Sequence, residues 1–125
     1  MTGLLQSSAL HTAVGFVLMG SWAWFANRTY DWPAPLVAAL VQGAITATIT
    51  YALKRAIEAV SARTKGRARY VLPPLVAALI SALVLTSLHA LAGTPALLAT
   101  ISVPFSVASI YAVIYSATLV KGQST

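Results

Sequence analysis

The sequence contains no cysteine and almost no acid. Asp31 and Glu58 carry its only carboxylate side chains, and charged residues of both signs make up 8% of its 125 positions. The absence of cysteine excludes disulfides, thiolate nucleophiles and thiolate metal ligands. There is also no cluster of acids for a metal, no glycine-rich phosphate loop, and no Ser-His-Asp arrangement in a strand and turn context. We therefore predict no metal, no cofactor and no catalytic residues, and hence no enzyme.

Apolar residues dominate what is present, at 58% of the chain. A soluble domain carries about a quarter charged residues, and one this small has too little interior to hide so much apolar surface. Lipid must therefore surround most of the side chains. A helix that crosses a hydrocarbon core of about 30 Å needs about 20 apolar residues. The sequence predicts an all-α membrane protein of four transmembrane helices, in a single domain over residues 1–125.

Aromatic residues and prolines mark the limits of the four apolar runs. The first run ends in Trp22 and Trp24, whose rings are typical of headgroup depth. Pro35 stands at the start of the second run, where a missing N–H has no cost, and Pro74 and Pro95 stand at the third and fourth. The predicted spans are 4–26, 36–59, 71–92 and 96–120. No basic segment precedes the first run, so we expect its helix to be retained rather than cleaved as a signal peptide.

Basic residues collect around one predicted loop, at about 60–70, between the second and third spans. The region holds six positive residues and one negative: Lys54, Arg55, Glu58, Arg63, Lys65, Arg67 and Arg69. Short loops rich in Lys and Arg stay in the cytoplasm. The net charge of +6 thus indicates membrane topology, and we expect no nucleic-acid partner. Lys121 follows the last span, so both termini are predicted on the cytoplasmic side of the cell inner membrane.

An internal repeat is indicated by a shift of 60 residues. The shift places Pro35 on Pro95 and Tyr51 on Tyr111. It pairs two helical hairpins of the same direction, as a parallel duplication about an axis along the membrane normal would. A second match pairs 35–40 with 74–79, which belong to helices of opposite direction. Both remain open, and we favour the first because it relates whole hairpins.

Small residues recur every four positions in two of the predicted spans. The second span has Ala39, Gly43 and Ala47, and the fourth has Ala108 and Ala112. This spacing places them on one helix face, where two backbones approach closely. Packing within the bundle is the favoured interpretation, and a self-association face is the alternative.

Gln42 is a polar side chain well inside the second span. Lipid offers its amide no hydrogen bonds, so the amide must find partners within the protein. It either bridges to another helix or lines a polar path for a lipid headgroup. Under the second interpretation, Gln42 and Tyr51 contact the polar head, and Lys54 and Arg55 contact a phosphate.

His11, His89 and Glu58 are the remaining candidates for chemistry. The two histidines differ in predicted depth by roughly 15–20 Å, so we expect separate polar contacts rather than a shared site. Glu58 follows Lys54 by one helical turn, which favours a local ion pair. A proton-coupled exporter needs a carboxylate within the membrane, whereas Glu58 is predicted beside the basic loop.

The segments that return to the cytoplasm show a family resemblance. One runs from Pro35 through Tyr51 to Arg55, and the other from Pro95 to Tyr115. In this pattern the chain resembles, over nearly its whole length, the GtrA family of small four-helix membrane proteins made of two hairpin halves. The family's Asn-aromatic pair reads Thr50-Tyr51 here. The resemblance implies a transport component that translocates or presents a polyprenyl-linked sugar for surface polysaccharide or lipid modification.

Membrane lipids and a lipid-linked phosphate are the partners that this function implies. The alternative function is a non-catalytic accessory or scaffold subunit of a larger membrane complex. Four short helices enclose little interior, so under either function we expect a homo-oligomer or a membrane partner subunit.

Overall fold

The computed structural model describes the backbone of residues 2–123 and the side chains of residues 9–122. Within this part the chain forms four α-helices and no strands: α1 Thr2–Ala26, α2 Ala34–Arg63, α3 Ala68–Leu91 and α4 Leu97–Gln123. Each helix is long and apolar enough to cross a membrane. The chain is therefore an all-α protein with the architecture of a multi-pass membrane protein, as the composition predicts.

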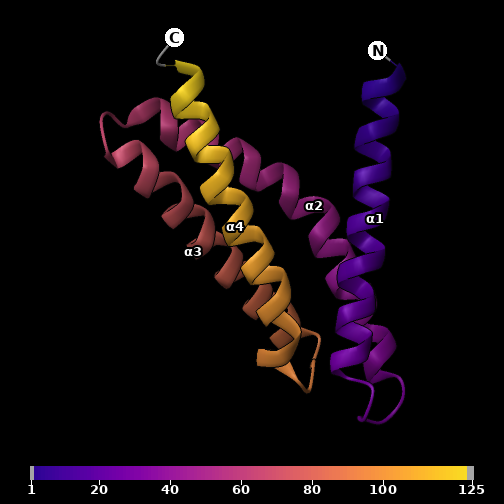
Figure 1. Cartoon of the computed structure of the whole chain (residues 1–125). Helices are drawn as coiled ribbons and strands as arrows, with labels where there is room; N and C mark the ends of the chain where they lie inside the picture. The colour runs from indigo at the N-terminus through magenta and orange to yellow at the C-terminus, as the bar shows by residue number, and fades with distance from the viewer. Residues whose placement is uncertain (1, 124–125) are drawn as a thin grey trace.

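The four helices converge at one end and diverge at the other (Figure 1). The converging end holds the 27–33 and 92–96 connections, and we call it the hairpin end. The opposite end holds the start of α1, the end of α4 and the α2–α3 connection. Every Lys and Arg except Arg28 lies toward this second end, so we call it the basic end.

The α2–α3 connection is shorter than the predicted loop at about 60–70. Helix α2 continues to Arg63 and α3 begins at Ala68, which leaves only residues 64–67 between them. Ala, Lys, Arg and Glu favour helix, so α2 does not stop where its charges begin. Gly66 makes the turn with a φ of +64°. The Arg69 Nε then donates to the carbonyls of Ser61 at 3.1 Å and Thr64 at 2.8 Å. These bonds provide partners for backbone carbonyls at the end of α2, where the helix itself offers none.

Helix α2 is the central element. It packs against α1, α3 and α4, whereas α1 contacts only α2 and α4. The apolar core lies between α2, α3 and α4 and consists of Leu53, Ile57, Ala77 and Ala112, each at most 2% exposed. No residue from the described side chains of α1, which begin at residue 9, belongs to this cluster. The two hairpins therefore pack differently, and the predicted duplication stays a prediction.

Helix α1 meets α2 through small residues. The carbonyl oxygen of Ala39 lies 3.1 Å from the position that a Cβ on Gly20 would take. On the other side of the contact, the Phe16 ring lies 2.7 Å from a Cβ built on Gly43. The absence of side chains at these two glycines is what permits the close approach. Gly43 and Ala39 thus face α1 within the same chain.

A buried asparagine ties α1 to α4 at the hairpin end. The Asn27 Nδ2 donates to the Ala23 carbonyl at 2.8 Å and to Thr100 Oγ1 at 2.7 Å. Its Oδ1 accepts from the backbone N–H of Ala96 at 2.9 Å. The asparagine thereby caps the start of α4, 69 residues along the chain. Its side chain is 0% exposed, and all its bonds are made inside the protein.

A second tie between α1 and α4 follows from Pro104. This residue has no N–H to donate to the Thr100 carbonyl one turn earlier. The Trp22 indole N–H instead donates to the carbonyls of Ala99 at 3.0 Å and Thr100 at 3.2 Å. The proline in α4 thus supplies the free acceptor that anchors α1.

Candidate functional site

The candidate site begins with a row of polar side chains on α2. Gln42, Thr46, Thr50, Lys54 and Glu58 follow one another every four residues. Each four-residue step turns the helix by about 40°, so successive side chains are neighbours, but the row winds around α2 and Glu58 lies about 160° from Gln42. The row covers about 24 Å at 1.5 Å per residue. It therefore leads from the inner part of the hairpin end to the basic end.

His89 of α3 meets this row at Gln42. The His89 Nε2 lies 2.8 Å from Gln42 Oε1, and its Nδ1 lies 2.7 Å from Thr94 Oγ1. An amide oxygen only accepts, so Nε2 carries the hydrogen and Nδ1 accepts from the Thr94 hydroxyl. The Gln42 Nε2 donates to Thr46 Oγ1 at 3.0 Å. Gln42 and His89 are both 0% exposed, and each provides a hydrogen-bond partner for the other.

A cavity of about 270 Å³ lies beside the row, with lining residues from all four helices. Most of the lining is aliphatic, including Leu18 of α1, Ile49 of α2 and Leu85 of α3. Its polar side chains are Gln42, Thr46, Thr50, Ser81 and Tyr111. No charged side chain lines it. The cavity suits a neutral or hydrocarbon group, or a small number of waters held at its polar points.

Ser81 is the unexplained polar group of this cavity. Its side chain is 0% exposed, and its Oγ has no hydrogen-bond partner. A buried hydroxyl without a partner costs free energy. Thr50, by contrast, donates to the carbonyl of Thr46 at 2.8 Å. Ser81 is thus a hydrogen-bonding group available to a molecule in the cavity.

The cavity is bounded toward the basic end by two stacked tyrosines. The rings of Tyr111 and Tyr115 lie 5.6 Å apart with an angle of 13° between their planes. Tyr111 lines the cavity. The Tyr115 hydroxyl donates to Glu58 Oε2 at 2.5 Å. The half-buried Glu58 carboxylate therefore bonds to α4, whereas the sequence favours an ion pair with Lys54.

A smaller pocket lies at the hairpin end. It measures about 220 Å³, and Asp31 and Thr94 are among its lining residues. Thr94, which is 8% exposed, thus has the pocket on one side and His89 on the other. Among the described residues, no three His, Cys, Asp or Glu side chains come close enough to hold a metal ion.

The predicted headgroup residues fall into two places. Gln42 is buried, whereas Tyr51, at 66% exposed, Lys54 and Arg55 are all exposed further along α2. Tyr51 lies nine residues, or about two and a half turns, after Gln42 and so faces the opposite side of α2. The structure therefore does not bring the four together. His11 is exposed on α1, far from His89 along the bundle.

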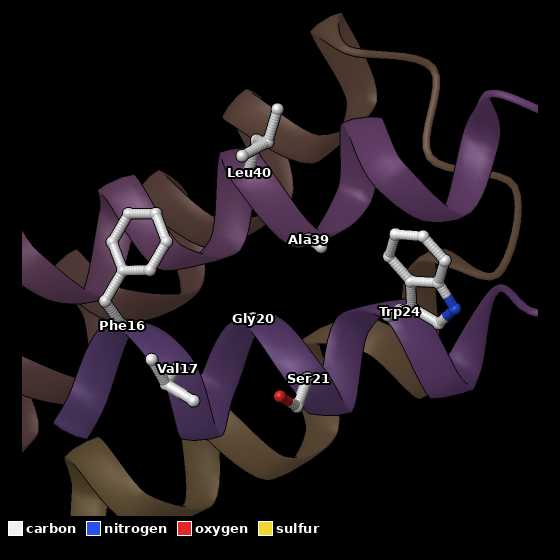
Figure 2. Close-up of a pocket in the computed structure, with 7 residues that line it drawn as sticks. All are labelled: Phe16, Val17, Gly20, Ser21, Trp24, Ala39 and Leu40. Atoms are coloured by element: carbon white, nitrogen blue, oxygen red, sulfur yellow. The ribbon is translucent and has the colours of Figure 1, made fainter. Parts of the chain in front are cut away.

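The small residues on α2 and α4 lie at helix contacts to different degrees. Gly43 is buried, Ala47 is half-buried, Ala112 is 0% exposed in the core, and Ala108 packs beside that core. Beside Ala39, a groove of about 360 Å³ runs along the α1–α2 contact. Figure 2 shows Gly20 and Ala39 within this groove, and Phe16, Leu40 and Trp24 as its larger side chains. Among the described residues, no ionisable side chain lines this groove.

Several residues of the site escape prediction from the sequence. Thr94 reads as part of a turn, Ser81 as a small residue in an apolar run, and Tyr115 as an interfacial aromatic. Helix packing brings Thr94 to His89, Ser81 to the cavity and Tyr115 to Glu58. The sequence alone does not show these three contacts. The one available signal is that a lone histidine or glutamate in or beside a membrane span requires a partner.

Comparison with protein-family models, with curated proteins and with solved structures finds no match to this chain.

Proposed function

We propose that this chain is a small membrane transport component that moves or presents a lipid-linked anionic group, such as a polyprenyl-linked sugar, without catalysing a reaction. The observation that carries the proposal is the 270 Å³ cavity between all four helices. The space is partly open to the outside of the bundle, so a chain-like group could enter it from the side. The aliphatic lining suits a hydrocarbon chain.

The polar row gives the anionic group its place. Lys54 is exposed and follows Thr50, a cavity-lining residue, by one helical turn. A phosphate at the basic end would meet Lys54 while its hydrocarbon chain reaches the cavity. Each basic residue near an anionic group at the membrane surface contributes about 1 kcal/mol. Arg55, on another face of α2, would contribute through the surface field rather than through the same contact.

The test is lipid movement in proteoliposomes of the full chain, with a fluorescently tagged polyprenyl phosphate and an impermeant quencher added outside. We expect the wild type to expose the inner-leaflet lipid faster than protein-free vesicles do. Lys54→Ala with Arg55→Ala should slow this exposure. The matched control is Lys65→Ala, which removes a charge from the 64–67 loop and should leave the rate unchanged. A wild-type rate equal to that of empty vesicles would eliminate lipid transport.

A second candidate function, an accessory subunit of a membrane complex, is favoured by the bonding of Gln42. Its amide is used by His89 and Thr46 within the chain, which is what a purely structural bridge requires. Under this function Gln42→Ala would impair association with a partner subunit rather than lipid movement. Copurification from mild detergent and crosslinking in native membranes test it. Recovery of the chain as a lone monomer in both would count against it.

A further inference from the structure

Two titratable side chains, His89 and Glu58, lie outside the cavity lining but are linked to it. His89 bonds to the lining residue Gln42, and Glu58 bonds to Tyr115, which stacks on the lining residue Tyr111. His89 is buried within the span of α3, and Glu58 is half-buried near the end of α2. An ionisable residue inside a membrane span is costly, and chains of His and Glu are typical of proton relays. Whether a proton can pass from one to the other depends on the groups that lie between them.

The hairpin-end part of the connection consists of direct hydrogen bonds. Asp31 and Thr94 line the 220 Å³ pocket at this end. Thr94 Oγ1 contacts His89 Nδ1 at 2.7 Å, and His89 Nε2 contacts Gln42 Oε1 at 2.8 Å. A proton in the pocket can therefore reach the His89 imidazole through the Thr94 hydroxyl.

The middle part is the cavity itself. Gln42, Thr46 and Thr50 line it from α2, and the unpartnered Ser81 hydroxyl lines it from α3. A buried site holds water where it has the space and two to four polar partners for each molecule. At about 270 Å³, the cavity has room for several waters. The Ser81 hydroxyl, with the remaining acceptor positions of Thr46 and Thr50, would hold waters between Gln42 and Tyr111.

The last part is the tyrosine pair and the carboxylate. Tyr111 lines the cavity, Tyr115 stacks on it, and the Tyr115 hydroxyl donates to Glu58 at 2.5 Å. Glu58 has Lys54 and Arg55 within one turn on its own helix, where water at the basic end reaches these exposed residues. Hydrogen bonds thus form the two ends of the connection, and the cavity between them is the part that water must bridge.

We propose that this row is a proton-transfer path across the membrane, an activity that does not depend on the proposed lipid transport. Thr94 passes its hydroxyl proton to His89 Nδ1 and takes a proton from a hydronium in the pocket. The imidazolium then gives its Nε2 proton to a cavity water, which leaves the proton on Nδ1. The starting tautomer returns when one water takes the Nδ1 proton and another gives a proton to Nε2. The new hydronium passes its proton through water beside Tyr111 to the Tyr115 oxygen as Tyr115 passes its own proton to Glu58, which releases it to water at the basic end.

Gln42 is the barrier on this path. Its amide oxygen occupies the position next to His89 Nε2 that a cavity water must take, and a neutral amide is a poor proton carrier. A proton passes only when this amide swings away from the ring. Removal of the Gln42 side chain should therefore speed proton transfer, whereas loss of His89 or Glu58 should stop it. Opposite effects from neighbouring residues distinguish a gated path from general leakiness.

The test uses the full chain in phosphatidylcholine and phosphatidylglycerol vesicles that contain a pH-sensitive dye. A potassium gradient with valinomycin sets the interior negative, and internal acidification is followed with time. We expect wild-type vesicles to acidify faster than protein-free vesicles. His89→Gln and Glu58→Gln, which keep hydrogen-bonding groups at both positions, should reduce the rate to that of protein-free vesicles. Gln42→Ala should raise it above wild type.

The matched control is His11→Gln, which replaces the chain's other histidine on the exposed part of α1 and should leave the rate unchanged. If His89→Gln fails to fold, Glu58→Gln carries the test alone. A wild-type rate equal to that of protein-free vesicles, or full activity in folded Glu58→Gln, would overturn the path. A folded Gln42→Ala variant no faster than wild type would overturn its role as the barrier. Lipid movement in the same vesicles is scored separately, so failure of one activity leaves the other tested.

Discussion

Replacement of Asn27 by alanine should loosen α1 from α4 at the hairpin end. The change removes the donations to Ala23 and Thr100 and the acceptor for the Ala96 N–H. Each interhelical hydrogen bond in a membrane bundle contributes on average about 0.6 kcal/mol. An uncapped helix start costs about 1 kcal/mol. Together these losses predict that the free energy of unfolding falls by about 2 kcal/mol.

The assay is unfolding by sodium dodecyl sulfate in mixed micelles, followed by the fluorescence of Trp22, Trp24 and Trp32. Trp22 is the sensitive probe because its indole N–H bonds to α4 beside Asn27. Thr29→Ala is the matched control, since Thr29 is exposed in the same connection and should unfold like wild type. An Asn27→Ala midpoint equal to that of the control would refute the cap and the tie that it makes.

Three further predictions address packing, orientation and the cavity mouth. Gly43→Leu should destabilise the chain by about 1–3 kcal/mol, because its side chain collides with Phe16, and detergent unfolding measures this; a wild-type midpoint would contradict it. A reporter inserted after Lys65 should be cytoplasmic and one in the Tyr30 turn should be external, and the reverse pattern would overturn the orientation. Tyr115→Phe should slow vesicle acidification, since it removes the hydroxyl that donates to Glu58; an unchanged rate would exclude that hydroxyl as a relay.

The helices themselves follow from the sequence. Apolar runs of sufficient length in a chain with 8% charge have no other stable form in lipid. The ends of the helices are harder to predict where two sequence preferences disagree about where a helix begins. Helix α3 starts at Ala68 and carries Pro73 and Pro74 inside it, although prolines favour the start of a helix. The five residues Ala68 to Leu72 continue the helix ahead of the prolines.

The site is predictable only in part. Gln42 is recognisable from the sequence as a group that needs a partner, but its partner His89 depends on how α2 crosses α3. Asn27 reads as a loop residue because its role is to cap a helix that begins 69 residues later. The grouping of Gln42 with Tyr51 illustrates a different difficulty. Proximity along a helix does not imply a shared face, and nine residues bring a side chain to the opposite one.

The most direct test of a functional cavity uses the absence of cysteine in the chain. A single cysteine at Thr46, which is half-buried and lines the cavity, is compared with one at Leu79, which is 58% exposed on the outer surface of α3. The reagent is a water-soluble thiol label added to the full chain in vesicles, and it reacts with the thiolate, which forms where water reaches the sulfur. We predict that Thr46→Cys is labelled and that Leu79→Cys is not. Equal protection of both cysteines would contradict a water-accessible cavity within the bundle.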